Sequence, residues 1–115
     1  MAATPQETDA VETLRGTIIA LVRSDRTDLT ARQLGVFLTC YLTEEEQTVR
    51  GLAKHLNVAK PAISRALDRL AEADLIKRKT DTTDRRSVLV GRTPAGSRFL
   101  RDIKVIVQKA AASPD

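Results

Sequence analysis

Residues 60–70 read KPAISRALDRL, and this stretch decides the fold. Its isoleucine and two leucines recur at the three- and four-residue spacing of an amphipathic helix. Pro61 falls where such a helix would begin, and proline suits a first turn because an N–H group there has no partner within the helix. The stretch therefore predicts a helix over about residues 60–73, with a polar and basic outer face.

A second short helix precedes this one. Thr48 can cap it, Leu52 and Ala53 face inward at helical spacing, and LNV (56–58) forms a tight turn before the next helix. Two short helices joined by a tight turn form the helix-turn-helix plan, in which the start of the second helix meets base edges in the major groove of DNA. An ordinary amphipathic helix with a solvated face would give the same pattern. On the DNA-binding interpretation, the contacting residues of this helix are Lys60, Pro61, Ser64, Arg65 and Arg69.

The next stretch, IKRKTDTTDRRSVLVGR (76–92), favours the DNA-binding interpretation. Two β-compatible runs flank a polar segment, which is the composition of a hairpin, and a hairpin after a helix-turn-helix is a wing. An arginine at a narrow tip can enter the minor groove, and lysines on the strands can reach phosphates. Charged hairpin tips also serve solubility alone. The expected DNA contacts here are Lys77, Arg78, Lys79, Arg85 and Arg86, with Asp84 holding the wing tip.

Charge follows the same division of the chain. The net charge of +4 separates into −4 over residues 1–47, +6 over residues 48–93 (eleven Lys and Arg against five Asp and Glu) and +2 over residues 94–115. A basic segment of this kind neutralises phosphates, although a solvated basic face has the same composition.

Helices are also predicted at both ends, over residues 5–24 and 94–112, each with a proline at its first position. Their apolar stripes exceed what a small core between them, residues 28–93, can cover. We therefore expect the terminal helices to pack together and to hold two copies of the chain in a homodimer. With 115 residues, the whole chain (1–115) is expected to be one domain. The predicted interface residues are Val11, Leu14, Ile18, Leu21, Leu100, Ile103 and Val107.

Other classes of protein fit poorly. No apolar run approaches the roughly 20 residues of a membrane span, and the N-terminus does not resemble a signal peptide, so we expect a cytoplasmic protein. There is no glycine-rich phosphate loop and no pair of carboxylates in an apolar context, which argues against an enzyme. Cys40 and His55 are the only residues of their types, so no metal or other cofactor is expected. We expect Cys40 to be a buried, inert thiol and His55 to lie at the edge of the core.

With these motifs in place, the sequence resembles the MarR family of winged helix-turn-helix transcriptional regulators over about residues 28–100. The wing pattern of that family, Asp-x-Arg followed by five residues and Leu-Thr, falls here on Asp84, Arg86 and Thr93, but Arg92 replaces the leucine. A charge at that position could rearrange the junction between the strand and the following helix. The resemblance implies a homodimer that reads a pseudo-palindromic site and usually represses. Many relatives bind phenolic ligands, but the scarcity of aromatic residues here makes control by a partner protein or by abundance at least as plausible.

The sequence thus predicts a mainly α fold with a small β-hairpin wing (α+β): a winged helix-turn-helix with N- and C-terminal dimerisation helices. The predicted function is sequence-specific binding of double-stranded DNA by a transcriptional regulator, acting as a repressor. The alternative is a winged-helix adaptor that turns its basic face to an acidic protein and does not select DNA sequences.

Overall fold

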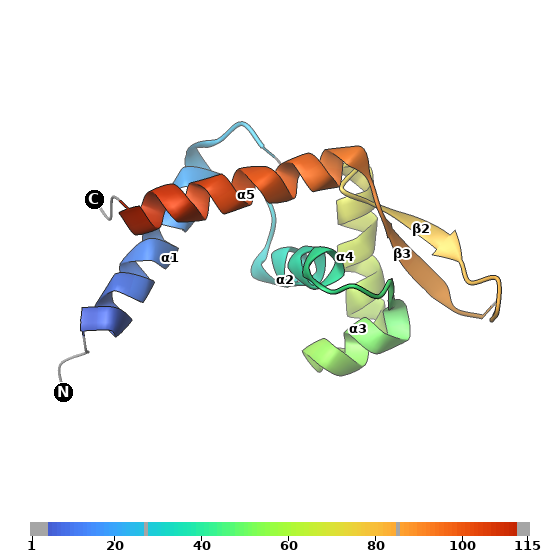
Figure 1. Cartoon of the computed structure of the whole chain (residues 1–115). Coiled ribbons are helices and arrows are strands. Elements are labelled where there is room, and N and C mark those ends of the chain that lie inside the picture. The colour runs from blue at the N-terminus through green and yellow to red at the C-terminus, as the bar shows by residue number, and fades with distance from the viewer. Residues whose placement is uncertain (1–4, 27, 85, 113–115) are drawn as a thin grey trace. The chain divides into compact units, whose positions relative to one another are not determined.

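The computed structural model describes residues 5–26, 28–84 and 86–112. Over these ranges the fold is mainly helical with a small antiparallel sheet, as the sequence predicts (Figure 1). In chain order the elements are α1 (Pro5–Arg23), α2 (Ala31–Leu42), β1 (Gln47–Thr48), α3 (Val49–Leu56), α4 (Lys60–Glu72), β2 (Ile76–Thr80), β3 (Val88–Arg92) and α5 (Pro94–Ala112).

Local hydrogen bonds explain where α2 and α3 begin. Thr30 and Gln33 form a capping box, in which the Thr30 hydroxyl accepts from the Gln33 N–H at 3.1 Å and the Gln33 side chain accepts from the Thr30 N–H at 2.9 Å. The Thr48 hydroxyl accepts from the Gly51 N–H at 2.9 Å, which confirms the predicted cap of α3. These bonds satisfy N–H groups that have no partner within their helices.

Two residues in the left-handed conformation end α3 and α4. Asn57 has φ 57° and turns the chain out of α3 toward α4. Asp74 has φ 60°, and the N–H of Leu75 then donates to the carbonyl oxygen of Leu70 at 2.9 Å. Both leucines are buried, and this hydrogen bond closes the end of α4.

The sheet has the strand order β1-β3-β2 and is antiparallel throughout. The β2–β3 hairpin is the predicted wing. Thr80 pairs with Val88 beside its tip, and Ile76 pairs with Arg92 at its base. The two-residue strand β1 was not predicted. It adds Gln47 opposite Val90 and so ties the residues before α3 to the wing.

The core of residues 29–99 is aliphatic around one aromatic cluster. The ring of Phe37 stacks on Tyr41 with centroids 4.4 Å apart and meets Phe99 edge-on at 5.2 Å. These three rings are all the aromatic residues of the chain. The largest fully buried side chains around them are Leu52, Ile63, Leu67, Leu70, Ile76 and Val36.

The first turn of α5 packs tightly against this cluster. The Tyr41 hydroxyl donates to the Leu75 carbonyl oxygen at 2.5 Å and accepts from the Thr93 N–H at 3.0 Å. A Cβ atom on Gly96 would lie only 1.8 Å from the same hydroxyl, so this position requires glycine. Thr93 caps α5, since its hydroxyl accepts from the Gly96 N–H at 2.9 Å.

Arg92 leaves this capping pattern in place. Its side chain is exposed, and Nη2 donates to the Thr43 carbonyl oxygen at 2.6 Å and to the Cys40 carbonyl oxygen at 3.3 Å. The charge therefore lies at the surface, against the C-terminal end of α2, and not among the apolar side chains beneath the strand.

The described residues up to Asp28, together with those from Leu100 onward, form a separate compact unit. Within it α1 and the C-terminal part of α5 approach closely, because a Cβ atom on Gly16 would lie 3.1 Å from that of Ala110. Arg26 and Asp102 form an ion pair at 2.5 Å. No helix among the residues described has the length and apolar character needed to cross a membrane.

Cys40 and His55 differ in how well they were predicted. Cys40 is 5% exposed, as expected, and burial raises the pKa of its thiol to about 11 even though Arg92 lies nearby. The prediction for His55 was wrong. Its side chain is exposed, because α3 turns Leu52 and Ala53 into the core and His55 toward solvent.

Candidate nucleic-acid interface

Helix α4 has the two faces that its sequence predicts. One face is buried in the core and consists of Ala62, Ile63, Ala66, Leu67 and Leu70. On the other face Lys60, Pro61 and Arg65 are exposed, while Ser64 and Arg69 are half-buried. Pro61 lies in the first turn of the helix, as predicted. Lys60 and Arg65 are thus presented on the same helix but, as the neighbouring elements show, on different sides of it.

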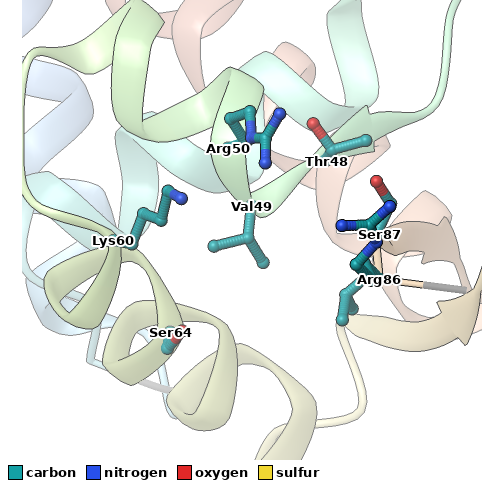
Figure 2. A pocket seen from close by; sticks show the side chains of 8 residues that line it. Thr48, Val49, Arg50, Lys60, Ser64, Arg86 and Ser87 are labelled. Atoms are coloured by element: carbon teal, nitrogen blue, oxygen red, sulfur yellow. The ribbon is translucent and has the colours of Figure 1, made fainter. Parts of the chain in front are cut away.

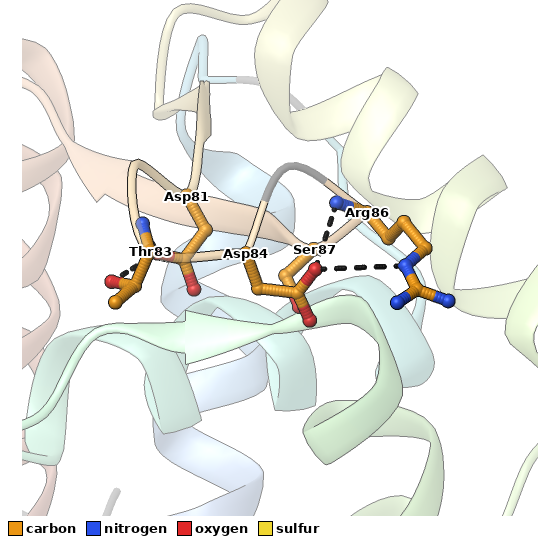
Figure 3. Close-up of polar contacts among 5 residues, drawn as sticks. All are labelled: Asp81, Thr83, Asp84, Arg86 and Ser87. Carbon is orange, nitrogen blue, oxygen red and sulfur yellow. Dashed lines mark hydrogen bonds and ion pairs between the residues drawn. The ribbon is translucent and has the colours of Figure 1, made fainter.

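The wing tip is built by two aspartates that accept hydrogen bonds from the residues just after them (Figure 3). Asp84 Oδ1 accepts from the Arg86 N–H at 3.0 Å, and the Ser87 N–H donates to the Asp84 carbonyl oxygen at 2.9 Å. Asp81 Oδ1 accepts from both the N–H and the hydroxyl of Thr83 at 2.9 Å. These bonds hold the pKa of the Asp81 carboxyl below its ordinary value, because they favour its charged form.

Arg86 extends from this braced turn. Its guanidinium lies 3.9 Å from Asp84 at Nε, and the side chain is 97% exposed. Asp84 therefore fixes the backbone from which Arg86 projects but leaves the guanidinium itself in solvent. Arg85, the other predicted tip residue, lies outside the described residues.

A groove of about 260 Å³ brings residues from α3, α4 and the wing together (Figure 2). Lys60 and Ser64 line it from α4, and Arg86 lines it from the wing. Arg50, at the start of α3, contributes a third cation. Arg50 was not among the predicted residues, although the spacing that turns Leu52 and Ala53 inward places it on the outer face of its helix. The remaining residues of the groove are Thr48, Val49, Ser87 and Val88.

Arg65 lines a different groove, of about 510 Å³, on the side of α4 that faces α2. Arg32, in the first turn of α2, lines the same groove, together with Ala62 and Ala66 at its floor. The predicted cations of α4 are therefore divided: Lys60 shares a surface with the wing, and Arg65 shares one with α2.

The three cations of β2 also differ from one another. Arg78 pairs with Asp68 of α4 at 2.5 Å, and Lys79 pairs with Glu46 at the same distance. Lys77 lies across Gly91 of β3, where a Cβ atom would be 3.1 Å from its Cγ. Among the described residues no carboxylate pairs with Lys77, so its ammonium group is the one on β2 available to an outside anion. On α4, Arg69 lies 4.0 Å from Glu72.

Comparison with known proteins agrees with this architecture. The chain resembles the MepR–DNA complex of S. aureus at 23% identity, covering 90% of this chain and 77% of MepR with a TM-score of 0.67. It resembles the transcriptional regulator Tm0710 of Thermotoga maritima at 19% identity, 90% and 70% coverage and a TM-score of 0.73. A crystal structure of MarR matches at 28% identity, over 70% of this chain and 54% of MarR, with a TM-score of 0.64.

The family assignment rests on the central part of the chain. The model of the MarR family matches residues 29–88, which span α2, the helix-turn-helix and most of the wing. These are 60 of the 115 residues, slightly more than half of the chain. The chain belongs to the MarR family of winged-helix transcriptional regulators, which are not enzymes.

Proposed function

We propose that this protein binds double-stranded DNA sequence-specifically as a homodimer and represses transcription. The observation that carries the proposal is the convergence of Arg50, Lys60 and Arg86, from three separate elements, on one groove beside the exposed face of α4. Three cations from α3, α4 and a hairpin tip suit the phosphate-lined surface of a duplex better than a flat protein surface. The DNA complex of MepR supports the same partner.

Each part of the interface has a chemical role. The first turns of α4 present Lys60, Ser64 and Arg65, whose donors match acceptors on base edges in the major groove. Arg86 projects from a narrow, braced tip and suits the minor groove, where negative potential is concentrated. Arg50 serves as a phosphate contact, because a cation beside the groove can position the DNA backbone without reading sequence. Lys77 has the same role on β2.

The homodimer is supported by exposed apolar side chains on α1. Val11, Leu14 and Ile18 are 64%, 60% and 44% exposed, and Val22, which was not predicted, is 74% exposed. Their spacing of three and four residues places them along one face of the helix. A contiguous apolar face of this kind typically marks an interface.

The residues predicted for the interface on α5 are less exposed than Val11 and Leu14 on α1. On α5, Val107 is 38% exposed and Leu100 is half-buried. Leu21, which lies on α1, is half-buried as well. Ile103 is only 7% exposed within the single chain, so it has little surface to offer a second copy.

Gel-shift titration of mixed genomic fragments tests the function. A regulator selects particular fragments in the presence of excess competitor DNA, and fragments recovered by repeated selection share a pseudo-palindromic sequence. Placing that sequence across a promoter then reduces transcription in vitro. Absence of a shift even at low salt would support the protein-adaptor alternative instead.

A further inference from the structure

Arg78 holds a position that differs from those of its neighbours on β2. Successive side chains of a strand point to opposite faces, so Lys77 and Lys79 share one face and Arg78 occupies the other. On that face Arg78 reaches α4. Its Nη1 lies 2.5 Å from Asp68 Oδ1, and its Nη2 donates to the Ser64 carbonyl oxygen at 2.8 Å.

The two acceptors lie one helical turn apart on α4, and a single planar guanidinium reaches both. This fork fixes the direction of the side chain as well as its distance, which one ammonium group could not do. Ser64 itself lines the groove that Arg86 enters from the wing tip. The contact therefore joins the middle of α4 to the first strand of the hairpin that carries Arg86.

This contact contributes little to the stability of the fold. The side chains of Arg78 and Asp68 are 37% and 57% exposed, and ion pairs so open to water contribute little to the free energy of folding. What the contact does determine is geometry. Strand β1 holds the hairpin along β3, whereas Arg78 connects β2 directly to α4 and so restrains the angle between them.

The geometry points to Arg78 as a positioning residue for DNA recognition and not a phosphate ligand. With Asp68 and the Ser64 carbonyl oxygen it forms a clamp that sets the angle between α4 and the wing. At that angle α4 and Arg86 reach the major groove and the adjacent minor groove at the same time. The role rests on the proposed DNA binding and extends it to a residue that need not touch DNA.

The two roles of Arg78 predict opposite effects of one substitution on DNA affinity. If Arg78 were a phosphate ligand, Asp68 would be a carboxylate that repels DNA, and Asp68→Asn should strengthen binding. If Arg78 acts through the clamp, Asp68→Asn removes a charged acceptor and should weaken binding. Glu72→Gln is the matched control, since it removes the same charge from the same helix at a residue that does not contact Arg78.

The binding experiment uses the full chain and a duplex obtained by in vitro selection. Asp68→Asn and Arg78→Lys are each expected to weaken binding about tenfold, the size of coupling typical of residues in one network. Neither should change the slope of log affinity against log salt concentration. Lys77→Ala, by contrast, should reduce that slope by about 0.9, the loss of one phosphate contact. Tighter binding by Asp68→Asn, or a reduced slope for Arg78→Lys, overturns the clamp.

A distance measurement tests the clamp without DNA. Spin labels on Glu72→Cys and Thr82→Cys, both at exposed positions, report the separation of α4 and the wing. We expect Arg78→Lys to broaden the distance distribution at an unchanged melting temperature, and an unchanged distribution would overturn the proposal. If the wild-type chain selects no DNA while Arg78→Lys still broadens the distribution, the proposed function is contradicted and the clamp is supported, so the two failures are distinguishable.

Discussion

Arg92 Nη2 donates a hydrogen bond of 2.6 Å to the carbonyl oxygen of Thr43, the residue that follows α2. The same nitrogen lies 3.3 Å from the Cys40 carbonyl oxygen, and the guanidinium carbon is 5.5 Å from the centre of the Tyr41 ring. The last turn of α2 has no basic residue of its own. Arg92 therefore supplies from β3 the cation that the negative end of a helix dipole favours.

Replacement of this cation with the leucine expected from the family pattern should destabilise the protein. Arg92→Leu removes two hydrogen bonds to carbonyl groups, a loss of about 1 kcal/mol. For a domain of this size that lowers the melting temperature by roughly 4 °C or more. Thermal unfolding followed by circular dichroism measures the change, with Arg98→Leu at an exposed position of α5 as the control. A higher melting temperature for Arg92→Leu would show that apolar packing outweighs the cap.

Arg65 should contribute to sequence selection. A bidentate contact to a base contributes about 1–3 kcal/mol of discrimination, so Arg65→Ala should weaken binding to the selected duplex by that amount and relax the preference at one base pair. Fluorescence anisotropy with the selected duplex and with random duplexes measures both effects. Equal losses on the two kinds of DNA would instead assign Arg65 to a phosphate, together with Arg32 in the same groove.

Arg86 should affect binding without affecting stability. Its side chain is 97% exposed and buries almost no surface, so Arg86→Ala should leave the melting temperature within about 2 °C while weakening DNA binding. Asp84→Ala should weaken binding as well, since it removes the acceptor that fixes the Arg86 N–H. A melting temperature that falls as far in Arg86→Ala as in a core variant such as Leu67→Ala would make Arg86 structural.

Sequence patterns predicted helices and caps well because their signals are local. The Thr48 cap of α3 is formed with the N–H of Gly51, three residues away, and the start of α4 at Lys60 follows from Pro61 and the apolar spacing. Strand β1 was missed because two residues are too few to show alternation, and its pairing partners lie more than 40 positions away.

The candidate site was predicted less completely, because its geometry depends on contacts between segments that are separated in the sequence. Exposed cations on β2 look equivalent in sequence, but their partners Asp68 and Glu46 come from distant segments. The neighbouring element beside which each cation of α4 lies also depends on how the elements pack together. Spacing could identify Lys60 and Arg65 as outward residues, but it could not place them in two different grooves.

Cys40 gives a pH-dependent test of the core. Burial raises the pKa of its thiol from 9.0 to about 11, so between these values the unfolded chain loses a proton that the folded chain keeps. Stability is therefore unaffected by this group below pH 9 and decreases as the pH rises toward 11. Urea titrations at pH 8 and pH 10.5 should show a larger decrease for wild type than for Cys40→Ala. An equal decrease, or rapid alkylation of the native thiol at pH 8, would contradict burial as the dominant effect.

The proposed homodimer predicts the spacing of the two half-sites on DNA as well as the oligomeric state of the protein. If two copies join through α1 and the terminal part of α5, two α4 helices related by a twofold axis enter successive major grooves, and the half-sites should lie roughly 10 base pairs apart. Ile18→Glu combined with Val107→Glu introduces charge at two exposed apolar positions, and both should be tolerated by the folded monomer because neither belongs to its core. Analytical ultracentrifugation should then show a monomer whose affinity for the full site has collapsed, whereas Gln108→Glu, at an exposed polar position on α5, should leave the dimer intact. A folded double variant that still sediments as a dimer would exclude this face as the interface, and a wild-type monomer that binds a single half-site equally tightly would exclude the dimer altogether.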